Sequence, residues 1–125
     1  MPWSEAANTD LSQLVAAAAD LCRKPLRHGV VLTSCADDED CSLRLEARSA
    51  DGERLAEEDL ELEIYRSGSD LNLTLAWCAD ELRPMLWQGG HPLWMDPEGR
   101  RCDRPQDGLP LEALARRLRA LLAPG

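Results

Sequence analysis

Residues 60–77 read LELEIYRSGSDLNLTLAW, and this stretch decides the fold. Large apolar residues alternate with other residues on both sides of a Ser-Gly-Ser-Asp turn at 67–70, which is the pattern of a β-hairpin. One face of this hairpin is apolar and the other is polar. Such a hairpin belongs to an antiparallel sheet with helices on a single face. A one-residue slip would expose every leucine, so the register is well defined.

A second hairpin is predicted before this one. Residues 29–33 are rich in β-branched side chains, which favours a strand that Cys35 extends, and residues 41–48 alternate strictly. The acidic run at 37–40 lies between them and forms a charged tip, and we expect Cys35 to face Cys41 across its base. The run lacks the spacing, the central glycine and the terminal glutamate of a calcium-binding EF-hand loop.

Helical periodicity appears near both ends of the chain. Asp10 is positioned to cap the first helix and Pro25 to terminate it, whereas Pro110 suits the first turn of the second. Residues 1–8 are expected to be a loose arm. The predicted apolar stripes are Leu11, Leu14, Val15, Ala18, Leu21 and Cys22 in the first helix, and Leu111, Leu114, Ala115, Leu118, Leu121 and Leu122 in the second.

These elements predict a single α+β domain over residues 1–125. We expect a mainly antiparallel meander sheet of five to seven strands, with the N- and C-terminal helices packed largely on one face. A chain of 125 residues is of one-domain size and can bury a core without a disulfide or a cofactor.

Residues 85–104 read MLWQGGHPLWMDPEGRRCDR and hold the candidate site. If Gly89-Gly90 is a two-residue turn and residues 96–99 form a four-residue turn, alternation sorts the meander into two faces. Leu86, Leu93 and Cys102 share one face. Met85, Trp87, Trp94 and Arg101 share the other.

The second of these faces is a candidate partner-binding surface, to which Arg100 adds another charge. Tryptophan and arginine are enriched at binding hot spots, and Arg101 above the Trp94 ring would be a cation–π contact. The alternative is that both indoles belong to the core, because the chain has no phenylalanine and the C-terminal helix could cover this face.

Catalytic motifs are missing from the sequence. It has no Gly-rich phosphate loop, no nucleophile elbow and no HExxH motif, and its five cysteines include no CxxC pair. We therefore assign no catalytic residue, no metal ligand and no cofactor. One alternative remains open: a small-molecule or metal-dependent site built on His91, Cys102 and Asp96.

The formal net charge of −9 disfavours nonspecific binding to nucleic acid or to an anionic membrane. The acidic excess lies before residue 83, and the remaining residues carry slightly more arginine than acid. A second alternative is a single-stranded nucleic-acid binder that uses Trp87, Trp94 and Arg101, since these residue types stack on bases.

The sequence has neither a secretory signal nor an apolar run long enough to cross a membrane, so a cytoplasmic protein is expected. Lys24 is the only lysine among many arginines, which is typical of GC-rich coding and indicates a bacterium.

The leading functional hypothesis is a non-catalytic protein-binding or assembly module, chaperone-like, with another protein or a second copy of the chain as partner. The order helix, meander, helix with an acidic balance resembles small secretion-type chaperones. A curved sheet with a C-terminal helix is similar to single-strand nucleic-acid-binding coactivator folds, which the negative charge disfavours. Both likenesses rest on element order and charge rather than on a motif.

Overall fold

The structure is a computed structural model that describes residues 5–37, 40–68, 70–79, 83–89 and 91–122. Over these residues, the chain forms two α-helices, seven strands and two short 3₁₀ turns. In order, these are α1 (Glu5–Cys22), β1 (Arg27–Asp37), β2 (Asp40–Arg48), η1 (Ala56–Glu58), β3 (Leu60–Ser67), β4 (Asp70–Trp77), β5 (Met85–Gln88), β6 (Pro92–Met95), β7 (Arg101–Cys102), η2 (Gln106–Gly108) and α2 (Leu109–Leu122).

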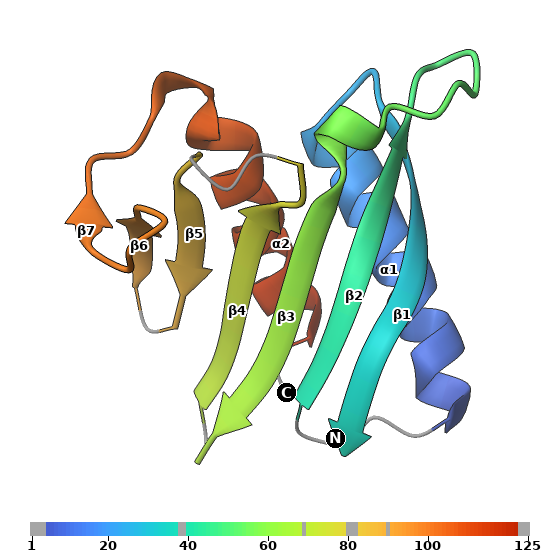
Figure 1. Cartoon of the computed structure of the whole chain (residues 1–125). Coiled ribbons are helices and arrows are strands. Elements are labelled where there is room, and N and C mark those ends of the chain that lie inside the picture. Colours follow the sequence, from blue (N-terminus) through green and yellow to red (C-terminus); the bar gives the residue numbers. More distant parts are fainter. Residues whose placement is uncertain (1–4, 38–39, 69, 80–82, 90, 123–125) are drawn as a thin grey trace.

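The seven strands form one antiparallel sheet whose spatial order is the chain order. Both helices lie behind this sheet, α1 near β1 and β2, and α2 near the middle strands (Figure 1). The α+β meander with its helices on one face is therefore confirmed. Among the described residues, no helix is long and apolar enough to cross a membrane.

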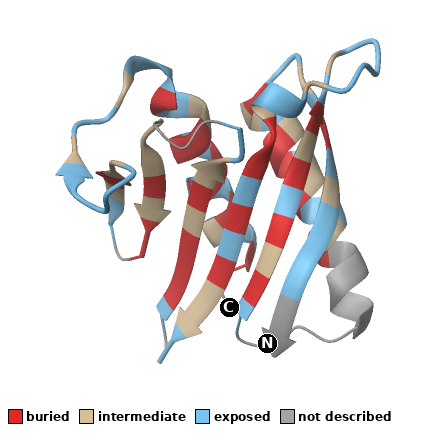
Figure 2. Ribbon diagram, viewed as in Figure 1, coloured by how far each residue is buried: buried red, intermediate tan, exposed pale blue. Residues whose placement is uncertain are grey.

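The β3–β4 hairpin has the predicted register. Leu62 lies opposite Leu75, and Ile64 lies opposite Leu73. All four side chains are at most 1% exposed and belong to the core between the sheet and the helices. Figure 2 shows buried and more exposed residues alternating along β2 and β3, as expected for a sheet that is covered on one face.

The β1–β2 hairpin is longer than predicted, because β1 continues to Asp37 and β2 begins at Asp40. Cys35 lies opposite Cys41, which confirms that expectation. The pairing is irregular between Leu32 and Ser34, where Thr33 is an extra residue in β1.

Each helix buries a narrower stripe than the sequence predicted. Val15 and Leu118 are fully buried, but Leu14, Leu21 and Leu121 are 37%, 51% and 45% exposed, so their assignment to the core is wrong. Only the side of each helix that faces the sheet or the other helix is covered, and these three leucines lie at the margin of that contact.

The N-terminal arm is also shorter than predicted. Helix α1 begins at Glu5, so residues 5–8 are helical and Asp10 lies inside the helix rather than at its cap. Residues 1–4 lie outside the described residues. The connector between β2 and β3 contains the short 3₁₀ turn η1.

Candidate binding face

The face of the sheet opposite the helices is open (Figure 1). Its residues are those that alternate with the core leucines. On β3 these are Glu61, Glu63 and Tyr65, whereas Leu60, Leu62 and Ile64 point to the core. The hairpin alternation that builds the core therefore also sets which side chains the open face presents.

An apolar patch lies on the open face where β5 and β6 pair. Met85 lies opposite Met95, and Trp87 lies opposite Leu93. The Trp87 indole nitrogen donates a hydrogen bond to the Tyr65 hydroxyl at 2.8 Å. All five side chains are half-buried, since no helix covers them. We call this set, Tyr65, Met85, Trp87, Leu93 and Met95, the Met–Trp patch.

A pocket of about 440 Å³ adjoins the Met–Trp patch and shares Met85 with it. Its walls combine apolar, acidic and basic groups from β3, β4, β5 and the 96–100 turn. The lining residues are Glu61, Glu63, Thr74, Ala76, Trp77, Cys78, Arg83, Met85 and Pro97. Among the described residues, neither Glu61 nor Glu63 forms an ion pair, so both carboxylates are available to a ligand.

Arg83 forms one side of this pocket and is held by two contacts. Its guanidinium lies 4.0 Å from the centre of the Trp77 ring, and it pairs with Asp107 at 3.5 Å. A second guanidinium, that of Arg23, lies 5.0 Å from the same ring. Trp77 therefore links the pocket to the polar groups at the end of α1.

The thiol in the pocket is poorly suited to nucleophilic chemistry. Cys78 is exposed at the surface, but partial burial of its thiol raises the pKa, and the charges of Glu61 and Asp59 raise it further. Because the thiolate is the reactive form, Cys78 stays protonated near neutral pH and is a weak nucleophile.

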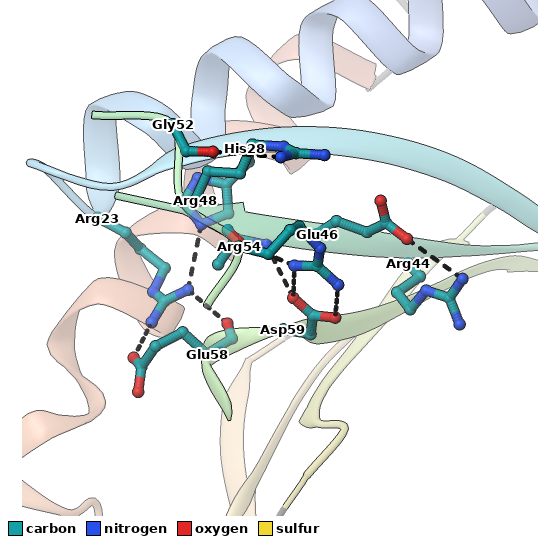
Figure 3. Close-up of polar contacts among 10 residues, drawn as sticks. Arg23, His28, Arg44, Glu46, Arg48, Gly52, Arg54, Glu58 and Asp59 are labelled. Carbon is teal, nitrogen blue, oxygen red and sulfur yellow. Dashed lines mark hydrogen bonds and ion pairs between the residues drawn. The ribbon is translucent and has the colours of Figure 1, made fainter. Parts of the chain in front are cut away.

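His28 is also poorly suited to act as a general base. Its Nδ1 lies 3.2 Å from Asp20 Oδ1. Its Nε2 lies 3.1 Å from a guanidinium nitrogen of Arg23 (Figure 3). Arginine can only donate, so Nε2 accepts and Nδ1 carries the proton. Arg23 is itself anchored by Glu58 at 2.8 Å. Both ring nitrogens are thus engaged in holding α1 to the sheet.

A second ion pair in the same region fixes the connector between β2 and β3. Both carboxylate oxygens of Asp59 accept hydrogen bonds from Arg54, at 2.8 and 2.9 Å, and the Ala47 amide donates to the same carboxylate at 2.8 Å (Figure 3). The bonds from Arg54 hold the pKa of Asp59 below its usual range. The role of this pair is structural, and it places β3 beside β2.

The predicted partner-binding residues do not all share one face. Met85 and Trp87 lie on the open face as expected, and Arg101 lies opposite Met95 on the same side and is exposed. Trp94 was assigned to that face, and this is wrong: it is 6% exposed, lies opposite Leu86 and belongs to the core. Leu93 takes its place on the open face.

The exchange of Leu93 and Trp94 follows from the lengths of two turns. Gln88 pairs with Pro92, so three residues rather than two join β5 to β6. The next turn is also one residue longer than predicted: the Asp96 amide donates to the Arg100 carbonyl oxygen, and Gly99 has a φ of 84°. The extra residue in the first turn moves Leu93 and Trp94 to the faces opposite those predicted. The extra residue in the second turn reverses this shift, so Arg101 and Cys102 keep their predicted faces.

Arg100 ends this turn rather than joining the open face. It is exposed, and its side chain lies 3.7 Å from the carboxylate of Glu98. The predicted cation–π contact of Arg101 with Trp94 is excluded by their faces, because Trp94 lies opposite Cys102 instead.

The alternative site of His91, Cys102 and Asp96 does not come together. His91 is exposed, Cys102 packs against the core, and Asp96 Oδ1 accepts hydrogen bonds from the amides of Glu98 and Arg100. Within the part of the chain that the structure describes, no group of three or more His, Cys, Asp or Glu side chains could hold a metal ion.

Sequence reasoning missed the pocket beside the patch. Glu61, Glu63 and Tyr65 were recognised only as the polar face of a hairpin, because their proximity to Met85 and Pro97 depends on how later strands add to the sheet. The available signal was that two glutamates and a tyrosine share that face in residues 60–65.

A family described as a domain of unknown function, DUF8659, matches residues 12–121 of the chain. The chain belongs to this family. The match runs from the eighth residue of α1 to the penultimate residue of α2, so the family unit includes the whole sheet and the open face. Searches of curated proteins and of solved structures gave no significant match.

Proposed function

We propose that this protein is a non-catalytic protein-binding module of the bacterial cytoplasm, of the assembly or chaperone type, and that the open face of its sheet is the binding surface. The observation that carries this proposal is the Met–Trp patch beside an acidic pocket, on a face that neither helix covers.

The residue types of the patch favour a protein partner. Methionine side chains adapt to differently shaped apolar surfaces, and tryptophan is enriched at binding hot spots. Trp87 is already oriented by its hydrogen bond to Tyr65, so little side-chain entropy is lost when a partner covers it.

The negative charge of the pocket favours partners that carry a basic residue. Glu61 and Glu63 are exposed, and the chain as a whole is strongly acidic. The expected partner is a segment that presents an apolar side chain to the Met–Trp patch and a lysine or arginine to these two carboxylates. Complementary charge of this kind mainly increases the association rate and the specificity.

The chemistry of the pocket supports a non-catalytic role. The Cys78 thiol has a raised pKa, and both ring nitrogens of His28 are occupied by Asp20 and Arg23. A nucleophilic mechanism needs a deprotonated thiol or a base with an available nitrogen.

The test is capture of a partner from the native cell, followed by calorimetry with the purified partner. Trp87→Ala should weaken binding about tenfold or more, as expected when a hot-spot side chain is truncated. Glu63→Gln should weaken binding less and should also reduce its dependence on salt, because it removes one attractive charge. Leu21→Ala is the matched control, since Leu21 is exposed on the helix side.

Unchanged affinity in both the Trp87→Ala and the Glu63→Gln proteins would refute the open face as the binding surface. A loss of affinity in Leu21→Ala alone would place the interface on the helices instead.

A further inference from the structure

The two edges of the sheet differ greatly in length. β7 at one edge consists of Arg101 and Cys102, whereas β1 at the other edge runs from Arg27 to Asp37. A long exposed edge strand presents unpaired backbone groups that can pair with another chain. Soluble proteins usually prevent this with a short edge strand, a β-bulge, a proline or a charge in the strand. β7 is short, whereas β1 is long and its first irregularity comes only after Leu32.

The middle of β1 lacks the residues that discourage edge pairing. Residues 29–36 contain neither a charge nor a proline, and two adjacent valines supply high strand propensity. The charges stand at the two ends: Arg27 begins the strand, and Asp37 ends it.

Exposed apolar side chains lie on both sides of this edge. Val31 lies opposite Arg44, hence on the open face, and it is 38% exposed. Leu32 lies opposite Leu43, hence on the helix side, and it is 44% exposed. Figure 2 shows the middle of β1 as exposed. A partner lying on either face would cover only one of these side chains, whereas a strand added beside β1 would cover both.

We propose that a second copy of this chain pairs along the outer edge of β1, in antiparallel orientation, so that one sheet continues through both subunits. A two-fold axis sets identical strands antiparallel and gives each copy the same contacts. The same axis brings Arg27 at the start of each β1 strand toward Asp37 at the end of the other. The charges at the two ends of β1 are therefore complementary between the two copies. The open face stays uncovered, so this interface is separate from the proposed binding surface.

The irregularity of β1 limits the strength of the pairing. Arg27 of one copy lies opposite Asp37 of the other only when the two-fold axis passes near Leu32. The register of β1 with β2 is interrupted there, between Leu32 and Ser34, so the two strands pair regularly only away from the axis. An interface built on part of one strand is small, and we expect a dissociation constant on the order of micromolar.

The experiment is sedimentation equilibrium of the full chain from about 1 to about 300 µM. The weight-average mass should rise from the chain mass of 13.9 kDa toward twice that value. Val31→Lys and Leu32→Lys should each weaken self-association about tenfold or more, because each places like charges beside the two-fold axis. Leu21→Lys is the matched control: Leu21 is an exposed leucine on α1, and its replacement should leave the dimer intact.

Hydrogen exchange measured at low and high concentration provides a second readout that needs no variant. Edge pairing forms backbone hydrogen bonds, so the amides of residues 27–32 should exchange more slowly at high concentration. This measurement still decides the question if a lysine variant fails to fold.

Three outcomes would overturn the proposal. The chain stays monomeric over the whole concentration range, the dimer persists in both lysine variants while they remain folded, or protection on dimerisation appears outside β1. A dimer that is lost in Trp87→Ala but kept in Val31→Lys would assign self-association to the open face and would likewise reject pairing along β1.

Discussion

His28 is a buried residue whose protonation is coupled to the stability of this fold. Its side chain is 0% exposed, and it connects Asp20 and Arg23 of the α1 end to β1. Burial lowers the pKa of His28 below its ordinary value of 6.5; the hydrogen bond to Asp20 opposes this shift, and the charge of Arg23 adds to it. The neutral ring is therefore the form that the folded protein prefers.

This preference predicts a loss of stability in mild acid. Between pH 6.5 and the lower pKa of the folded state, the unfolded chain binds the His28 proton more readily than the folded chain does. The stabilisation is complete above pH 6.5 and is lost as the pH falls toward the folded pKa, with a slope of at most about 1.4 kcal/mol per pH unit. The measurement is the free energy of unfolding in urea, determined for wild type and His28→Gln at several pH values below 6.5.

The variant should show a shallower pH dependence than wild type, because glutamine does not titrate. His91→Gln is the matched control, since His91 is the other histidine and is exposed, and it should retain the wild-type dependence. Equal slopes for wild type and His28→Gln would contradict this account of His28.

At the same scale, the two tryptophans of β5 and β6 show what local sequence can and cannot predict. Trp87 precedes both turns, and alternation with the buried Leu86 is enough to place it on the open face. Trp94 follows a glycine pair that is compatible with turns of two or three residues. The glycine pair itself does not decide between these turn lengths. Gly89 lies close to β4, where a Cβ would be 2.7 Å from the side-chain oxygen of Asn72.

Among the elements, α2 is held against the sheet by its buried leucines, by one close aromatic contact and by a hydrogen bond from Arg119. Gly108, at the end of η2, packs directly against the buried ring of Trp94. Glu112 pairs with Arg104 at 2.9 Å and with Arg116 one turn later, and Arg119 donates to the carbonyl oxygen of Leu71. The entry into α2 is thus set by Trp94, which explains why this indole is in the core.

Gly108→Ala should therefore destabilise the protein. A Cβ at this position would lie 2.7 Å from one atom of the Trp94 ring and 2.8 Å from another, and the ring is held rigidly in the core. Overpacking of this kind costs about 1–3 kcal/mol, measured as the free energy of unfolding in urea.

Gly29→Ala is the control for that measurement. A Cβ on Gly29 would have no atom within 4 Å, so the variant should be as stable as wild type or slightly more stable. Equal stability of the Gly108→Ala and Gly29→Ala proteins would mean that Trp94 does not pack against Gly108.

At this scale, the type and order of the elements could be predicted from the sequence. Which apolar helix residues are buried and which are exposed could not. The residue 60–77 alternation fixes a hairpin by itself, because both of its strands lie in one stretch. The exposure of Leu14, Leu21 and Leu121 depends on how far apart the two helices lie, which no local pattern encodes. The pocket was missed for the same reason, since it joins β3 to the distant turn at Pro97.

Across the whole molecule, the two faces of the sheet have different roles. The core leucines lie between the helices and the sheet, and the open face carries the Met–Trp patch and the pocket with Glu61, Glu63 and Arg83. The acidic excess of residues 1–82 places negative charge on the strands that border the patch. The sheet thus presents an uncovered surface with apolar and charged side chains, as a binding module requires.

The central claim is that the open face contacts a protein partner, and site-specific photo-crosslinking in the native cell tests it most directly. A photoreactive phenylalanine analogue would replace Thr74, which lines the pocket, or Ala17, which is exposed on α1. The account predicts a crosslinked partner from position 74 that disappears when Trp87→Ala is added, and no crosslink to that partner from position 17. A partner that crosslinks from position 17 and not from position 74 would contradict it.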